Sequence, residues 1–189
     1  MGDLNYKVSE KQLLEIRNKI FLEAGIPALK KNDFEKSPFS TAWYGKNNLG
    51  DYTYELCRLS KDSHIEFIVT HISKGDSWIK IFLNIFMLQP SVTTLEHLNG
   101  VDGLQYHLSP NNLTRMRLRI DDYKGIPLFR TKEHRLKSFK SEIELRKREA
   151  ALKDLIEDDL TNIDSFVTRW HQLHKLNTTD WKGNIVSGK

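Results

Sequence analysis

The segment of residues 78–88 limits the possible folds of this chain more than any other part of its sequence. Its apolar residues alternate with a period of two, which is typical of a β-strand, and Pro90 ends the run. One face of the predicted strand is wholly apolar: Ile79, Ile81, Leu83, Ile85 and Met87. Because such a face has to be buried, we expect this strand to lie in the centre of a sheet with its apolar side in the core.

The opposite face of the same strand mixes aromatic and polar side chains. Its members are Trp78, Lys80, Phe82, Asn84 and Phe86. Two outcomes are open for a face of this kind. Either a second layer of structure covers it, or it is exposed and serves as a binding surface.

The preceding segments also have strand composition. Residues 39–44, 52–59 and 64–72 are rich in aromatic and β-branched residues and are separated by clusters of turn residues. The turns are too short for helical crossovers, so neighbouring strands are predicted to pair as an antiparallel meander.

Helical patterns stand at both ends of the chain. Ser9 and Gln12 have the spacing of a capping box, and apolar residues at helical spacing follow until Gly25 and Pro27 end or kink the helix. Residues 137–160 are dense in helix formers, and Thr161 is expected to cap a second helix. The predicted fold is α+β: an N-terminal helix, an antiparallel sheet of about five or six strands, and two C-terminal helices packed on the sheet. Residues 1–176 form a single domain in this prediction, and residues 177–189 form a frayed tail.

A cationic surface is the most distinctive candidate for function. Arg115, Arg117 and Arg119 alternate with apolar residues, so they are predicted to project from one face of a strand. If Trp78 and Lys80 share that sheet face, arginine and aromatic groups form a platform suited to nucleic-acid stacking and phosphate contacts, or to docking of an acidic protein. The structural alternative is that these arginines pair with acids on the packed helices, such as Glu144, Asp154 or Glu157.

The motifs for catalysis are incomplete. The Gly75-Asp76-Ser77-Trp78 block resembles the nucleophile block of GDSL hydrolases, but the chain has no Asp-x-x-His to supply the base and the acid. His171 and His174 are spaced to share a metal ion, yet no cysteine pair or Glu-x-x-His accompanies them. We therefore expect no catalytic residue, metal or cofactor. An enzyme whose site combines His64, His71 or His107 with an acid in space stays open as a third class.

Composition narrows the setting of the protein. The formal charge of +4 makes nucleic acid a possible partner without singling it out. The only cysteine, Cys57, cannot form an intrachain disulfide, and no apolar run is long enough for a signal peptide or a membrane span. The expected location is the cytoplasm, with no membrane attachment.

The order of aromatic and aliphatic positions resembles the bacterial DUF4304 domains over residues 10–125. The resemblance is carried by Phe34, Trp43, Tyr44, Gly50, the Tyr54-Glu55-Leu56 run and residues 65–88. It implies an N-terminal helix, an antiparallel meander and C-terminal helices, and a likeness to immunity proteins that neutralise a bacterial toxin by binding it. The Gly-Phe-Lys-Lys run of that family is replaced here by residues 32–36, and no catalytic residue is carried over.

These observations lead to two hypotheses for function. The first is a non-enzymatic cytosolic protein-binding domain, immunity-like in action, that uses the mixed sheet face. The alternative is a nucleic-acid-binding module that uses the same face. In both, the predicted contact residues are Trp78, Lys80, Arg115, Arg117 and Arg119.

Overall fold

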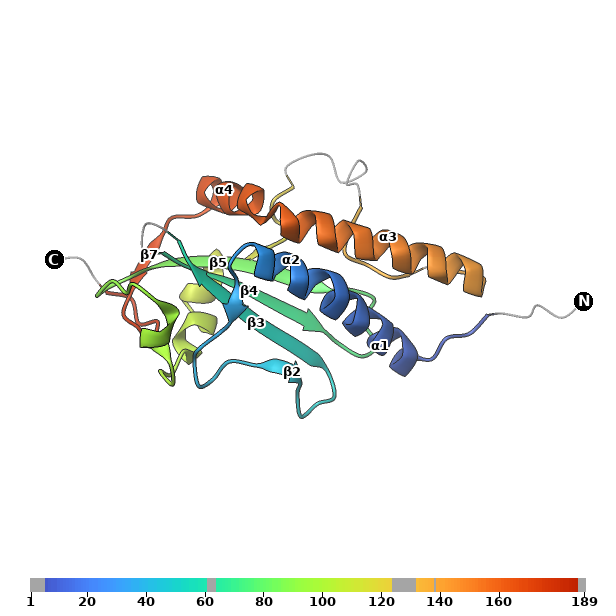
Figure 1. Cartoon of the computed structure of the whole chain (residues 1–189), viewed down its shortest axis with the longest axis horizontal. Coiled ribbons are helices and arrows are strands. Elements are labelled where there is room, and N and C mark those ends of the chain that lie inside the picture. The colour runs from blue at the N-terminus through green and yellow to red at the C-terminus, as the bar shows by residue number, and fades with distance from the viewer. Residues whose placement is uncertain (1–5, 61–63, 124–131, 138, 187–189) are drawn as a thin grey trace, which may run out of the picture.

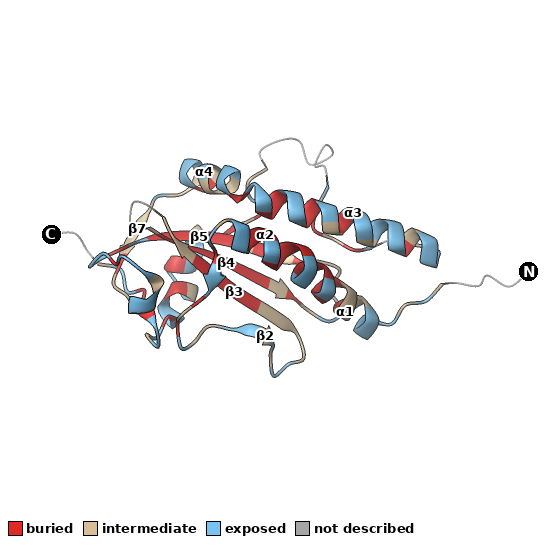
Figure 2. Ribbon diagram, viewed as in Figure 1, coloured by how far each residue is buried: buried red, intermediate tan, exposed pale blue. Residues whose placement is uncertain are grey.

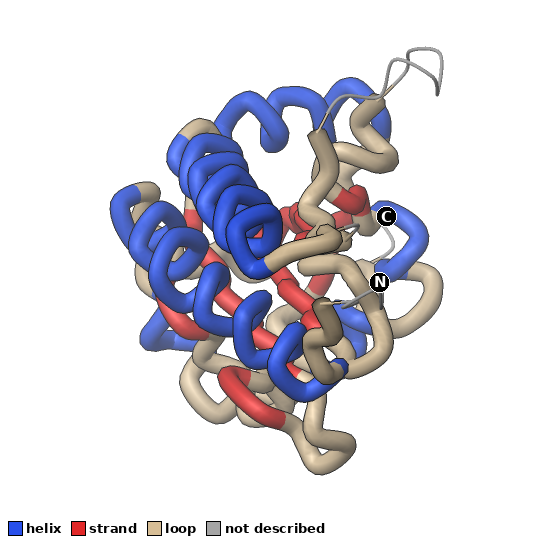
Figure 3. The backbone as a smooth tube through the Cα atoms, turned by 90° about the vertical axis from the view of Figure 1, so that its right-hand side faces the viewer, coloured by secondary structure: helices blue, strands red, loops and turns tan. Residues whose placement is uncertain are grey.

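The computed structural model describes residues 6–60, 64–123, 132–137 and 139–186. One seven-stranded sheet has the α-helices against one face and turns and loops against the other (Figures 1 and 3). The predicted α+β architecture is confirmed, with an N-terminal helix, an antiparallel sheet and two C-terminal helices that contact the sheet.

The sheet is built on three long, antiparallel central strands. They are β3 (Tyr52–Leu59), β4 (His64–Ile72) and β5 (Lys80–Leu88). Four short strands complete its two edges: β1 (Glu35–Lys36) and β2 (Tyr44–Lys46) on β3, and β6 (Met116–Arg117) and β7 (Asn177–Thr179) on β5. The predicted central strand is thus confirmed as β5, since β4 pairs with one of its edges and β6 and β7 share the other.

Two of the predicted boundaries are wrong. The strand expected at residues 39–44 begins only at Tyr44, because Phe39 turns inward and is buried. The tail expected to fray from Asn177 instead adds a parallel strand to β5, and the Val186 amide donates a hydrogen bond to the Thr178 carbonyl over 2.9 Å. Residues 187–189 of that predicted tail lie outside the described residues.

The N-terminal helix is confirmed together with its capping box. In α1 (Glu10–Ile20) the Gln12 amide donates to Ser9 Oγ over 3.2 Å, and the Ser9 amide donates to Gln12 Oε1 over 3.0 Å. The helical path does not end at Gly25. A π-helical turn, Phe21–Gly25, leads into α2 (Ile26–Lys31), and a side chain at Gly25 would meet the Phe21 ring at 2.5 Å.

The C-terminal helices are α3 (Glu142–Thr161) and α4 (Ile163–Leu173). Ser141 caps α3 by accepting a hydrogen bond from the Glu144 amide. Asn162, and not the predicted Thr161, occupies the junction between the two helices. In Figure 2 the buried residues of these helices face the sheet, whereas their exposed residues face outward.

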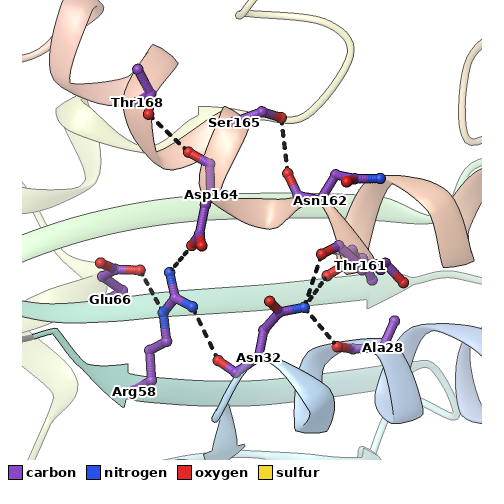
Figure 4. Close-up of polar contacts among 10 residues, drawn as sticks. Ala28, Asn32, Arg58, Glu66, Thr161, Asn162, Asp164, Ser165 and Thr168 are labelled. Atoms are coloured by element: carbon purple, nitrogen blue, oxygen red, sulfur yellow. Dashed lines mark hydrogen bonds and ion pairs between the residues drawn. The ribbon is translucent and has the colours of Figure 1, made fainter.

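Polar contacts hold the corner where α2, α3 and α4 meet the sheet (Figure 4). The Arg58 guanidinium of β3 donates from Nε to Glu66 Oε2 over 2.9 Å and from Nη1 to the Asn32 carbonyl over 3.0 Å, and it pairs with Asp164 through Nη2. The Asn32 amide group donates to three carbonyls at the ends of α2 and α3, those of Ala28, Leu160 and Thr161. One arginine and one asparagine thus satisfy helix ends that packing alone would leave without partners.

The sheet has a core on each face. The larger core lies under the helices and includes Phe21, Leu29, Ile68, Ile81 and Trp170. The smaller core lies under the loops and includes Phe39, Phe67, Phe86, Leu98 and Tyr106. The loop layer therefore covers the mixed face of β5 at Phe86 but not along the whole strand. One part of that face is buried under a second layer, as one of the two predictions had it, and the other part remains accessible.

Candidate functional site

The uncovered part of the loop face lies where β3, β4 and β5 approach the β4–β5 turn. Strand register places Thr53, His71 and Lys80 side by side across the sheet, and it places Phe82 beside Arg117. We call this region the open end. Its members are half-buried or exposed: Thr53, His71, Trp78, Lys80, Phe82, Arg115, Arg117 and Arg135.

Trp78 is the centre of the open end. The Cζ atoms of Arg117 and Arg135 lie 4.3 and 4.8 Å from the centroid of its ring. Residue 135 is brought there by an isolated antiparallel bridge with Trp78, and Arg135 Nε donates to Ser77 Oγ over 2.6 Å. Both guanidinium groups are thus held against an aromatic ring at distances typical of cation–π contact.

Phe82 of β5 repeats this arrangement four residues after Trp78. The Arg115 Cζ atom lies 4.1 Å from the ring centroid, and the His71 ring meets the same ring edge to face at 5.9 Å. Arg115 is exposed, and among the described residues its guanidinium makes no ion pair or hydrogen bond. Among the described residues its charge is therefore not balanced by an acid in contact.

Lys80 of the open end forms an ion pair with Asp76. Its Nζ atom lies 2.6 Å from Asp76 Oδ2 in the β4–β5 turn. Burial alone would raise the pKa of Asp76, but hydrogen bonds from Lys80 and from the Trp78 amide outweigh burial and lower that pKa. Asp76 is therefore ionised at neutral pH and compensates one of the four cations.

A buried carboxylate adjoins the open end on the same sheet face. Glu55 is 4% exposed, and its Oε1 atom accepts a hydrogen bond from Ser37 Oγ over 2.8 Å. Its Oε2 atom lies 2.9 Å from His107 Nε2. Both oxygens have partners inside the fold, so Glu55 does not offset the arginines of the open end.

His71 carries no charge at neutral pH. Burial, followed by the positive charges of Arg115, His107 and Lys80, lowers its pKa from 6.5 to about 4. The Thr53 hydroxyl lies 3.3 Å from His71 Nδ1. The cationic character of the open end therefore comes from its arginines and Lys80, not from histidine.

Acid should destabilise the protein through His71. Because the folded-state pKa is depressed, the unfolded chain binds a proton below pH 6.5 that the folded chain takes up only near pH 4. Stability is full above pH 6.5, and its loss between pH 6.5 and 4 should reach about 2 to 3 kcal/mol from this residue. Urea denaturation of the wild type and His71→Asn at pH 7 and pH 4.5 measures the difference. Equal losses in both proteins would contradict the assignment.

Arg119 does not join the open end, so its predicted place on the cationic strand face is wrong. The strand that was predicted to carry all three arginines stops at Arg117, and Arg119 turns away with φ of 63°. Its Nη2 atom lies 2.6 Å from Oδ1 of Asp159 on α3, and His134 Nε2 lies 2.7 Å from Oδ2 of the same residue. The alternative of pairing with a helix acid thus holds for Arg119, with Asp159 as the partner in place of the acids considered from sequence.

The four other predicted contact residues, Trp78, Lys80, Arg115 and Arg117, do lie together. His71 was missed as a member of the open end. It was considered only as a possible catalytic histidine, although strand pairing with Lys80 could have placed it. Arg135 is one of the cations that follow the Arg115–Arg119 segment in the sequence, but no pattern predicts its contact with Trp78, which depends on an isolated bridge between residues far apart in the chain.

The motifs weighed for catalysis occupy other environments. Ser77 Oγ accepts its hydrogen bond from Arg135, and Asp76 pairs with Lys80. The rings of His171 and His174 both pack on Trp170, at centroid distances of 5.2 and 5.4 Å. Within residues 6–60, 64–123, 132–137 and 139–186, no three histidine, cysteine, aspartate or glutamate residues are grouped to hold a metal ion.

The single cysteine and the helices of the described residues bear on redox chemistry and on membrane attachment. Cys57 is fully buried, and burial raises the pKa of its thiol, so the thiolate does not form at neutral pH. Among the helices that the structure describes, none has the length and apolar character required to cross a bilayer.

Comparison with known proteins adds no relative to this description. The chain matches no family model, no curated protein sequence and no solved structure. The resemblance to the DUF4304 domains therefore stays a prediction from the pattern of aromatic and aliphatic positions.

Proposed function

We propose that this chain is a non-enzymatic protein-binding domain, immunity-like in action, whose open end binds an acidic segment of a partner protein. The observation that carries the proposal is the set of ring-supported arginines. Arg115, Arg117 and Arg135 each lie within 5 Å of an aromatic centroid on one sheet face. A guanidinium that already rests on a ring loses less conformational freedom when it meets a carboxylate, so more of the interaction energy appears as affinity.

Charge balance supports an acidic partner. Of the acids beside the open end, Glu55 and Asp76 already have side-chain partners within the fold. Asp121 accepts a hydrogen bond from the Arg117 amide over 2.7 Å and attracts Arg115 without an ion pair among the described residues. Lys80 is balanced by Asp76, whereas Arg115 is exposed and has no acid in contact within the described residues. An acidic protein segment complements such a surface and is drawn to it over a distance set by the ionic strength.

The nucleic-acid alternative has one observation in its favour and one against it. Arginines above aromatic rings occur on surfaces that bind single strands, where they contact phosphates. Base stacking, however, needs a free aromatic face, and guanidinium groups already lie over Trp78 and Phe82. Carboxylate recognition requires no such face, so a protein partner is the better fit.

The cytosolic setting is part of the proposal. The chain contains a single cysteine, so its fold depends on no intrachain disulfide, which suits a reducing compartment. The buried Cys57 thiol is also withdrawn from exchange with other thiols.

Charge reversal at the open end provides the test. Fluorescence anisotropy would measure binding of a labelled oligoglutamate peptide and of a labelled single-stranded oligonucleotide of equal charge. Arg115→Glu and Arg117→Glu, made singly, should each weaken peptide binding by at least about tenfold, because an attraction becomes a repulsion. The control is Arg146→Glu on α3, an exposed arginine that pairs with Glu142 outside the open end.

The result separates the two partners. Peptide binding that is tighter than oligonucleotide binding at physiological salt supports the proposal. Tighter oligonucleotide binding that weakens steeply with added salt would establish the nucleic-acid alternative instead. Peptide binding that changes equally in all three variants would remove the open end as the site.

A further inference from the structure

Arg17 of α1 is a buried cation whose hydrogen bonds are incomplete. The residue is 0% exposed, and its Nη2 atom donates to the Ser73 carbonyl over 3.0 Å. Its Nε atom is buried without a hydrogen-bond partner, and among the described residues the guanidinium makes no ion pair. Burial lowers the pKa of Arg17, and Asp76, Glu10 and Asp51 attract its charge without forming an ion pair with it. A buried charge without a counter-ion in contact is costly, typically by about several kcal/mol.

A pocket adjoins this guanidinium. It has a volume of about 200 Å³ and lies between α1, the β4–β5 turn and the segment that precedes α3. Beside Arg17, its walls include Leu13, Leu136, Lys137 and Phe139. A concave site with apolar walls and a few convergent polar groups is the usual form of a small-molecule site.

The charges around the pocket decide which anion fits. Asp76 and Glu10 also line it, so a dianion such as phosphate would meet two carboxylates. Asp76 is neutralised by Lys80 at 2.6 Å, and Glu10 is exposed and stays hydrated. With Asp76 paired, the two cations Arg17 and Lys137 stand against Glu10 alone, so the lining keeps one positive charge, which one negative charge balances.

We propose that this pocket binds a single carboxylate group, with Arg17 as its principal ligand and the apolar walls around a short hydrocarbon portion. The Nε edge of a guanidinium matches the two oxygens of a carboxylate, and the buried Nε atom of Arg17 would gain the partner it lacks. Two sources share this chemistry: a free short-chain carboxylic acid and the terminal carboxylate of a peptide.

The site is separate from the open end. The β4–β5 turn lies between them, with Gly75, Asp76 and Ser77 lining the pocket while Asp76 and Ser77 also bond to Lys80 and Arg135. The carboxylate proposal does not depend on the proposed function, because an oligoglutamate peptide and a short acid are measured in different experiments with different variants.

Calorimetric titration tests the site with matched pairs of probes on the full chain. Butyrate and butyramide differ only in the carboxylate, as do an N-acetylated dipeptide and its C-terminal amide. The wild type should bind at least one acid saturably and at least about tenfold more tightly than the corresponding amide, since the amide cannot balance Arg17. Tighter binding of the peptide acid than of butyrate identifies a chain end, and the reverse identifies a free acid.

Two variants link that binding to the pocket. Arg17→Met keeps a long side chain without the charge and should abolish the preference for acids, whereas Arg146→Met on the exposed face of α3 should keep it. If Arg17→Met does not fold, Leu13→Trp, which fills the pocket from a half-buried position, should abolish binding instead. Amides that bind as tightly as acids, acid binding that survives in a folded pocket variant, or no saturable binding by the wild type would each overturn the proposal.

Discussion

Replacing Asp159 with alanine should lower the free energy of unfolding by about 3 to 5 kcal/mol. Asp159 is 3% exposed, and its carboxylate accepts hydrogen bonds from the Arg119 guanidinium and from His134 Nε2. His134 is equally buried at 3% exposure. The substitution removes the acceptor of a half-buried arginine and of a buried imidazole, which costs more than the ion pair itself is worth.

Urea denaturation followed by circular dichroism measures this loss. Glu157→Ala is the matched control, because Glu157 is an exposed acid on the same helix and its loss should change stability by less than about 0.5 kcal/mol. Replacing the cluster as a whole, with Asp159→Leu, His134→Phe and Arg119→Met, should cost less than Asp159→Ala alone. A loss below about 1 kcal/mol for Asp159→Ala would show that the contacts of Asp159 with Arg119 and His134 contribute little to stability.

Lowering the pH should also weaken the stabilisation that comes from Asp159, His134 and Arg119. Burial alone would raise the pKa of Asp159, but the hydrogen bonds from His134 and Arg119 outweigh it and lower that pKa below 3.8. The stabilisation is therefore present above 3.8, the reference value, and is lost as pH falls through the lower folded-state pKa. This loss lies at lower pH than the one from His71.

Replacing Trp170 with alanine should cost about 3 to 5 kcal/mol. The Trp170 side chain on α4 is 0% exposed, and its Nε1 atom donates to the Thr114 carbonyl over 2.7 Å. Alanine would leave a cavity between α4 and the sheet and an unsatisfied carbonyl. Trp170→Phe preserves most of the volume but not the hydrogen bond, so it should lose less, about 1 to 3 kcal/mol.

The chain offers a control of the same residue type. Trp43 is 46% exposed beside β2, so Trp43→Ala should change the free energy of unfolding by no more than about 0.5 kcal/mol. Urea denaturation at pH 7 compares the three variants with the wild type. Equal losses for Trp170→Ala and Trp43→Ala would contradict the position of α4 on the sheet.

The long strands β3 and β4 could be predicted from sequence because burial on both faces gives them runs rich in aromatic and β-branched residues between clusters of turn residues. The ranges predicted for β3 and β4 coincide with Tyr52–Leu59 and His64–Ile72. Short strands lack such a signal. The two residues of β6 and the three of β7 are fixed by pairing with β5, a contact between segments far apart in the chain.

The cationic surface was likewise predictable in part. Trp78 and Lys80 lie on β5 or next to it, and Arg115 and Arg117 come to the same face by pairing at Phe82. Arg119 departs because its backbone enters the left-handed region, which alternation of residue types does not reveal. The Arg17 pocket gave no signal, since an arginine within an amphipathic helix is ordinarily exposed.

The pairing of β7 with β5 has a consequence for biosynthesis. On the side of β5 that faces away from β4, residues 86–88 pair with residues 177–179. A ribosome makes residues 177–179 after α3 and α4, so the nascent domain carries an unpaired sheet edge until those residues have emerged. During that interval the growing chain is most open to association with other unfinished chains, and the emergence of residues 177–179 closes the edge.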